Sequence, residues 1–164
     1  MTTRAASLAA CVALLFCLAL GGARAQATLP ELTGRVSDDA AILSPDARAG
    51  ITDTLAAFGA ASKIQLVVAT VKSLGGEAIE PYATRLFNAW ALGDAARKDG
   101  VLLLIAKADH RVRIEVGRGL EGRLTNARAA AILADAVLPA FKNGDFDLGA
   151  RAGVDAIIAA LREK

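Results

Sequence analysis

A glycine-rich stretch in the second half of the chain combines residue types that can hold a phosphate group. Gly117, Gly119 and Gly122 repeat the spacing of a dinucleotide-binding turn. They lie between a strand pattern and a helix pattern, where backbone N–H groups and a helix N-terminus attract anions. Arg118 and Arg123 add guanidinium groups that form charge-assisted hydrogen bonds with phosphate oxygens. The stretch therefore predicts a ligand-binding loop in which the three glycines approach the anion.

Acidic residues offer a second chemistry near the same loop. Asp99 and Glu121 could bring together carboxylate oxygens for a hard cation, and Ca²⁺ accepts such loop-built, partly hydrated sites. Asp38 is a third candidate metal ligand, in an extended segment that could reach either end of a sheet. This interpretation predicts a calcium site formed by Asp38, Asp99 and Glu121.

A bound metal would also allow phosphoryl chemistry. The cation would neutralise the phosphoryl oxygens and position a water molecule, and Arg118 or Arg123 would stabilise the charge of the transition state. Asp94 is the candidate general base. The catalytic candidates are therefore Asp94, Arg118 and Arg123.

The same residues also permit a purely structural interpretation, which stays open at this point. Glycine is common at the end of a strand, where the backbone bulges or adopts a left-handed conformation. In that case Gly117 and Gly119 end an edge strand and Glu121 faces solvent.

Hydrophobic periodicity predicts the elements that must position these residues. Apolar runs rich in β-branched residues indicate two buried strands, and an alternating run indicates a third strand with one wet face. These strands cover residues 64–71, 101–106 and 112–116. Amphipathic patterns with capping residues indicate four helices, at about residues 45–58, 79–90, 126–139 and 147–161.

The connections determine the topology. Only residues 107–110 separate the second and third strands, so these strands must form an antiparallel hairpin, whereas the helix between the first two strands makes that pair parallel. The predicted fold is a three-layer α/β/α sandwich around a small mixed sheet. Asp94, Asp99 and the glycine stretch then share one end of the sheet. The hairpin tip lies at the other end, and Asp38 is expected beside it.

This topology is incompatible with a nucleotide cofactor. A dinucleotide fold needs its glycine turn after the first strand of a βαβ unit and an acidic residue at the end of the next strand. Here two helices and no strand follow the glycine stretch, and Asp135 lies inside a helix pattern. We therefore expect no nucleotide cofactor.

Composition indicates an exported protein with one domain. Residues 1–25 combine Arg4, an apolar run and Ala23-Arg24-Ala25, the pattern of a signal peptide with its cleavage site. Both cysteines lie in this leader, so residues 26–164 have no disulfide framework. They hold seventeen basic and seventeen acidic residues, a balance that argues against a nucleic-acid binder. We expect a periplasmic or secreted protein with no stable membrane span after cleavage.

Several other features are assigned structural roles. Trp90 lies on the apolar stripe of its helix and is expected in the core. His110 is expected to be a solvated turn residue, and Asp147 the N-cap of the last helix. Residues 26–32 are taken as a short lead-in, and residues 36–40 as an extended segment with a turn before the first helix.

Four ordered blocks of the sequence resemble the TPM domain family. They are residues 32–44, 87–106, 111–126 and 138–157, which span essentially the whole predicted domain. The family signature is carried by Gly34, Val36, Asp38, Ala40, Trp90, Gly93, Gly100, Gly117, Gly119, Leu120, Glu121 and Gly122. The sequence departs from it at Asp99, Arg118 and Asn126, where the family often has asparagine, an aromatic residue and aspartate.

The resemblance implies an exported α/β/α sandwich. Some family members are described as acid phosphatases of the thylakoid lumen, others are linked to photosystem repair, and calcium has been associated with the fold. Two hypotheses follow. The first is a calcium-binding accessory module that acts on an unidentified partner protein of the cell envelope. The alternative is a metal-assisted acid phosphatase whose partner is a phosphorylated small molecule. No activated nucleophile is recognisable in the sequence, which favours the accessory module.

Overall fold

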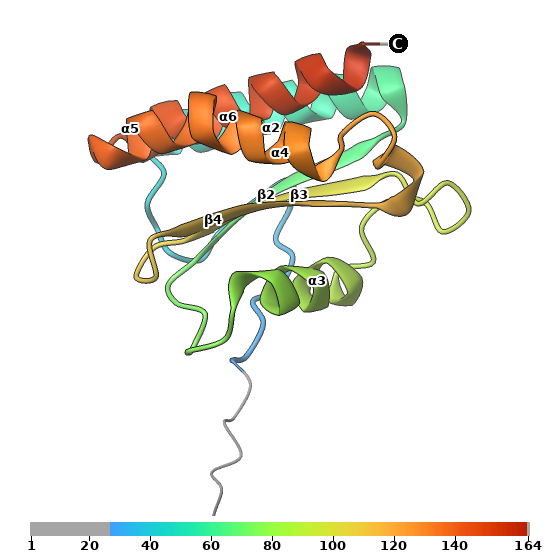
Figure 1. The fold of residues 1–164 in the computed structure, drawn as a ribbon. Helices are drawn as coiled ribbons and strands as arrows, with labels where there is room; N and C mark the ends of the chain where they lie inside the picture. The colour runs from blue at the N-terminus through green and yellow to red at the C-terminus, as the bar shows by residue number, and fades with distance from the viewer. Residues whose placement is uncertain (1–26, 164) are drawn as a thin grey trace, which may run out of the picture.

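A four-stranded sheet separates two layers of helices in the computed structural model, which describes residues 27–163 (Figure 1). The predicted leader, residues 1–25, lies outside the described residues. Within residues 27–163, no helix is both long enough and apolar enough to cross a bilayer. The predicted α/β sandwich is confirmed.

The sheet has the order β1-β2-β3-β4, and its strands are Val36–Asp38, Gln65–Val71, Gly100–Ala106 and Arg111–Val116. The first three strands are parallel, and β4 runs antiparallel to β3. The predicted parallel pair and hairpin are therefore correct. Because Gln65 lies opposite Gly100 and Val71 opposite Ala106, the amino ends of β2 and β3 share one end of the sheet.

Strand β1 corrects the prediction of a plain extended segment with a turn at residues 36–40. Its three residues pair with β2, and Asp38 lies opposite Thr70. Such a short segment, with two polar residues, gives too little alternation to predict a strand. The Asp38 carboxylate then closes the following turn, where it accepts hydrogen bonds from the Ile42 and Leu43 N–H groups at 3.1 and 3.2 Å.

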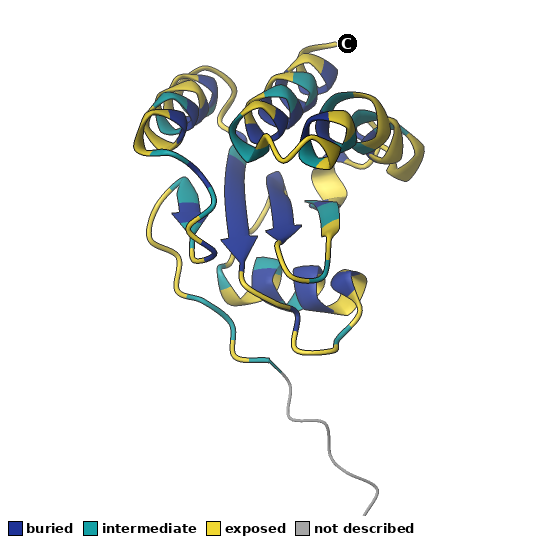
Figure 2. Ribbon diagram, turned by 90° about the vertical axis from the view of Figure 1, so that its left-hand side faces the viewer, coloured by how far each residue is buried: buried dark blue, intermediate teal, exposed yellow. Residues whose placement is uncertain are grey.

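Helix α3 (Ile79–Ala89) covers one face of the sheet alone, and the other helical segments cover the opposite face (Figure 1). Those segments are α2 (Pro45–Ser62), α4 (Asn126–Ile132), η2 (Leu133–Val137), α5 (Leu138–Lys142) and α6 (Phe146–Arg162). Figure 2 shows that the buried residues lie on the strands and on the helix faces turned toward them.

Three helix boundaries differ from the sequence prediction, and the first is the end of α2, which lies at Ser62 and not at about residue 58. The helix expected to end at Pro139 continues to Lys142, and a π-helical turn, η2, directly precedes α5. Pro139 has no backbone N–H to donate to the carbonyl four residues before it. The wider π-helical turn accommodates this missing hydrogen bond. The last helix is capped by Asp145, whose carboxylate accepts the Leu148 N–H at 2.9 Å. Asp147 instead accepts the Ser44 N–H at 2.9 Å, which joins α6 to the start of α2.

The segment predicted as a short lead-in packs against α3. The Trp90 indole donates a hydrogen bond to the Pro30 carbonyl at 3.0 Å, and Arg85 donates one to the Ala27 carbonyl at 3.2 Å. Ala27 and Leu29 lie against the apolar cluster between α3 and the sheet. Trp90 packs at the edge of the same cluster and is half-buried, so the prediction that it belongs to the core is correct in part.

Candidate functional site

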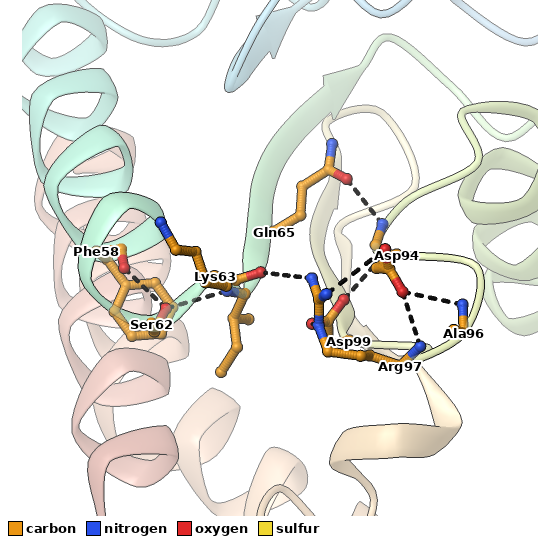
Figure 3. Close-up of polar contacts among 10 residues, drawn as sticks. Phe58, Ser62, Lys63, Gln65, Asp94, Ala96, Arg97 and Asp99 are labelled. Atoms are coloured by element: carbon orange, nitrogen blue, oxygen red, sulfur yellow. Dashed lines mark hydrogen bonds and ion pairs between the residues drawn. The ribbon is translucent and has the colours of Figure 1, made fainter.

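The loop that precedes β3 is built around one buried carboxylate (Figure 3). Asp99 is 6% exposed; its Oδ1 accepts the Asp94 N–H at 2.8 Å and its Oδ2 accepts from Arg97 Nε at 2.5 Å. Burial opposes ionisation of Asp99, but the Asp94 N–H and the Arg97 guanidinium outweigh it and hold the pKa of Asp99 below its usual value. Asp99 is therefore charged, and both of its oxygens are engaged by the chain.

Asp94 closes the same loop. Its Oδ1 accepts the N–H groups of Arg97 and Ala96, each at 2.9 Å, and these bonds lower the pKa of Asp94. Its Oδ2 lies 3.5 Å from Arg97 NH1. A carboxylate that is stabilised in its ionised form accepts a proton less readily, so this arrangement does not favour the general-base role predicted for Asp94.

The glycine stretch packs its backbone directly onto this loop. The Gly117 N–H donates to the Gly100 carbonyl at 2.8 Å and the Gly119 N–H to the Lys98 carbonyl at 3.1 Å. A Cβ atom on Gly117 would overlap the Lys98 carbonyl oxygen, and one on Gly119 would overlap that of Arg97. Both N–H groups are thus used within the chain and cannot also bind an anion.

The structural reason for Gly117 and Gly119 is neither an anion-binding loop nor a bulge or left-handed turn, the two explanations that the sequence suggested. Gly117 has a φ of −66°, which is not left-handed, and a Cβ atom on Gly122 would meet nothing within 4 Å. Gly117 and Gly119 are required because two backbone segments approach closely, whereas Gly122 is not required by packing. The structure supports a structural role for the first two glycines, with close packing in place of a bulge or a left-handed turn.

The three expected calcium ligands do not converge. Asp99 and Glu121 lie at the same end of the sheet, as predicted, since Glu121 directly follows the segment η1 (Arg118–Leu120) that packs beside Asp99. Asp38 lies at the other end, opposite Thr70. Within residues 27–163, no group of three or more His, Cys, Asp or Glu side chains is placed to hold a metal ion. Asp99 is already paired with Arg97, so these residues do not fit one calcium ion.

Basic side chains surround the surface between α2, the Asp99 loop and η1. Two adjoining clefts lie here, with volumes of about 400 and about 500 Å³, and both are lined by Lys63, Ile64 and Arg97. Arg123 lines the first and Arg35 the second. We call the two together the basic cleft. Among the residues that the structure describes, its only acidic lining residue is Asp99, which Arg97 already neutralises.

Local geometry positions each basic side chain. Lys63 follows the last turn of α2 with a left-handed φ of 64°, and its carbonyl accepts from Arg97 NH2 at 3.4 Å (Figure 3). Gly59 leaves room for the Arg35 guanidinium, because a Cβ atom there would lie 3.1 Å from Arg35 NH1. Among the described residues, Arg35, Lys63 and Arg123 have no acidic partner within 4.0 Å.

Sequence reasoning found Arg123 but missed the other basic residues. The parallel pairing of β2 with β3 was predicted, and it places the residues before Gln65 next to those before Gly100. That register was the signal that Lys63 would lie beside the Asp99 loop. Arg118, the other arginine proposed from sequence, is exposed and does not line the basic cleft.

The basic cleft can neutralise an anion, but its described lining offers no activated nucleophile. Within residues 27–163, Ser62 is the only hydroxyl residue of the lining. Its Oγ donates to the Phe58 carbonyl at 2.7 Å and accepts the Ile64 N–H at 3.1 Å. A serine held this way by backbone groups has no neighbouring base to remove its proton. The basic side chains of the cleft can donate charge-assisted hydrogen bonds to an anion.

Comparisons with known proteins agree with the fold. An N-terminal domain from P. gingivalis, solved by NMR, is 30% identical with a TM-score of 0.73, and the match covers 79% of this chain and 82% of that one. An N-terminal domain from Corynebacterium glutamicum is 17% identical, with a TM-score of 0.62 over 84% of this chain and 88% of that one. A protein from the psychrophilic bacterium Bizionia argentinensis is 18% identical, with a TM-score of 0.63 over 73% of this chain and 81% of that one.

The family comparison covers most of the chain. The comparison with curated proteins found no match. The sequence profile of the TPM domain matches residues 36–160, a range that contains all four strands, the Asp99 loop and the glycine stretch. The chain therefore belongs to the TPM domain family.

Proposed function

We propose that this TPM-domain protein is an exported accessory protein of the cell envelope that binds a phosphorylated ligand in the basic cleft. The observation that carries the proposal is the convergence of Arg35, Lys63, Arg97 and Arg123 on two adjoining clefts. The signal-peptide pattern of residues 1–25 supports export. The ligand is a phosphomonoester, carried either by a small molecule or by an envelope protein.

The charge balance of the cleft supports an anionic ligand. Arg97 is held by Asp94 and Asp99, so its guanidinium is fixed in position, whereas Lys63 and Arg123 have no acidic partner among the described residues. Guanidinium and ammonium groups recognise phosphate through charge-assisted hydrogen bonds. A phosphate dianion would offset the positive charge that the chain itself leaves uncompensated.

Binding is better supported than catalysis or calcium binding. Phosphoryl transfer needs an activated nucleophile or a metal-bound water, and the carboxylates nearest the cleft, Asp94 and Asp99, accept hydrogen bonds from the chain. Ca²⁺ prefers six to eight oxygen ligands. Of the two predicted ligands at this end, Asp99 is paired with Arg97, and only Glu121 has no ion-pair partner among the described residues. The phosphatase hypothesis is therefore tested as the alternative, by measuring phosphate release.

The proposal is tested by calorimetric titration of residues 26–164 with phenyl phosphate. We expect the double variant Lys63→Gln/Arg123→Gln to bind roughly tenfold or more weakly, since a hydrogen bond to a charged group contributes about 1.5–3 kcal/mol. Arg118→Gln is the matched control, because Arg118 is exposed but does not line the basic cleft. Equal affinity of the double variant and the control contradicts the proposal.

A second measurement separates binding from turnover. Phosphate release from phenyl phosphate is followed at acidic and neutral pH, with Ca²⁺, with Mg²⁺ and with a chelator. We expect binding without release. Release that stops in the Lys63→Gln/Arg123→Gln variant contradicts the accessory role and supports an acid phosphatase that uses the same cleft.

A further inference from the structure

An apolar cavity lies at the end of the sheet opposite the basic cleft. Its volume is about 230 Å³. Apolar walls come from the end of β3, the start of β4, α5 and the start of α6: Ile105, Ala106, Val112, Leu138, Phe141 and Phe146. Figure 1 shows α5 above this end of the β3–β4 hairpin. A cavity of about 150 Å³ with apolar walls can bind benzene, so this one has room for one aromatic ring or a short alkyl chain.

Packing against α6 keeps the cavity open on its helical side. The Phe141 and Phe146 rings lie 5.1 Å apart at 47°, a tilted aromatic pair. Phe141 lies against Gly149, where a Cβ atom would overlap the Phe141 ring. The absence of a side chain at Gly149 therefore lets the ring rest on α6, as part of the wall.

The rim of this cavity is basic. Lys107, His110, Arg111 and Lys142 complete the lining, which contains no acidic residue from the described part of the chain. Among the described residues, none of these four side chains has an acidic partner within 4.0 Å. The positive charge at the mouth is therefore not balanced by a contact within residues 27–163.

The carboxylates closest in sequence to the rim are engaged elsewhere. Asp109 at the hairpin tip accepts the Leu74 N–H at 2.8 Å, which turns it toward the α3 side of the sheet. Asp145 caps α6, and Asp147 accepts the Ser44 N–H. Residues 27–163 thus form apolar walls and a cationic mouth, and a bound anionic ligand would balance the positive charge of the mouth.

We propose that this cavity binds a small free carboxylic acid that carries one aromatic ring or short alkyl chain. The apolar group lies against Phe141 and Phe146, and the carboxylate lies at the mouth, where Arg111 and Lys142 donate charge-assisted hydrogen bonds to it. A neutral molecule of the same shape would bury the same apolar area but leave these cations without a partner. This site takes a different ligand from the basic cleft and does not depend on the function proposed for that cleft.

Three matched ligands test the proposal by calorimetry with residues 26–164: 3-phenylpropionate, 3-phenylpropanol and 3-phenylpropylamine. We expect 3-phenylpropionate to bind, the alcohol to bind roughly tenfold or more weakly, and the amine to give no binding heat. Inorganic phosphate, which has no apolar group, should not compete. Equal affinity for the acid and the alcohol, or no binding of the acid at millimolar concentration, overturns the proposal. Tighter binding of a peptide that ends in phenylalanine overturns the assignment to a free acid.

Two variants locate the ligand. Arg111→Gln/Lys142→Gln should weaken 3-phenylpropionate binding at least tenfold without changing the melting temperature, and Arg48→Gln, an exposed arginine on α2, should leave it unchanged. Val112→Phe should block the cavity and abolish binding of the acid. If Val112→Phe does not fold, the Arg111/Lys142 variant decides alone. Unchanged affinity in that variant overturns the proposal.

Discussion

Arg97 Nε lies 2.5 Å from Asp99 Oδ2. Arg97 is therefore paired with the carboxylate that the sequence analysis assigned to a calcium ion. The pair neutralises the negative charge that the sequence leads one to expect at this site. Asp99 holds Arg97 in place, and Arg97, Lys63 and Arg123 line the same cleft. The basic side chains that line the cleft beside this loop support the proposal that the cleft binds an anion.

The Arg97–Asp99 pair should make the fold sensitive to acid. The pKa of Asp99 is lowered in the folded protein, so its ionised form contributes stability at any pH above the unfolded value of about 3.9. That contribution is lost as the pH falls through the lower, folded-state pKa. We expect Asp99→Asn to lower the free energy of unfolding at pH 7 by about 1–3 kcal/mol and to flatten its decline in acid. Urea unfolding between about pH 2 and 7 measures both effects.

A control separates this pair from a general loss of negative charge. Asp53 is exposed on α2, so Asp53→Asn should change the free energy of unfolding by no more than about 0.5 kcal/mol. Equal effects of the two substitutions would show that the buried pair contributes nothing specific.

Alanine substitutions at two glycines of the glycine stretch should have different effects on the free energy of unfolding. Gly119→Ala should destabilise the fold by about 1–3 kcal/mol, because the new methyl group would overlap the Arg97 carbonyl oxygen. Gly122→Ala should stay within about 0.5 kcal/mol of the wild type, because nothing lies within 4 Å of the added atom. Denaturant titration of both variants measures the difference. Similar losses in the two variants would disprove the close-packing explanation.

Residues 27–32 should stabilise the α3 side of the sheet. Their removal would expose Trp90 and free the indole that donates to the Pro30 carbonyl. We expect a loss of about 1–3 kcal/mol in the free energy of unfolding, from the lost burial of Leu29 and the lost hydrogen bonds. Trp90 is the only tryptophan, so a red shift of its emission reports the exposure directly. Unchanged emission and stability would assign the segment no structural role.

Phosphate binding at the basic cleft should weaken as salt is added. The cleft is open to solvent, and exposed charges are screened over about 8 Å at physiological ionic strength. We expect the affinity for phenyl phosphate to fall steadily from 0.05 to about 0.5 M NaCl by roughly tenfold. The Lys63→Gln/Arg123→Gln variant should show a shallower dependence. A salt-independent affinity would indicate that charge does not carry the binding.

The sequence was sufficient to predict the architecture except for the short strand β1. The uninterrupted apolar runs of β2 and β3 identify buried strands, and a link of only four residues between β3 and β4 permits no crossover. Ser44 and Thr125 cap their helices, because their side-chain oxygens accept backbone N–H groups, a role that serine and threonine commonly fill. These features depend on local patterns, which a sequence displays directly.

The site was harder to predict because its charges depend on tertiary contacts. The amino-acid sequence of residues 94–99 does not show that the Arg97 side chain donates to Asp99 instead of facing solvent. The glycine spacing is equally ambiguous, because close backbone packing and anion binding both require a small residue. The predicted pairing of β2 with β3 was enough to place Lys63 near the Asp99 loop. A single lysine after a helix matches no known motif, however, so it was not recognised as a site residue.

The most direct test of the basic cleft is an amide chemical-shift titration of residues 26–164 with phenyl phosphate. Because Lys63, Arg97 and Arg123 line one cleft, we expect saturable shifts at residues 62–65, 97–99 and 119–124. The Lys63→Gln/Arg123→Gln variant should lose these shifts and keep its folded spectrum. Shifts that centre on another part of the surface, or that persist in the variant, would contradict the proposal that the basic cleft binds the phosphorylated ligand.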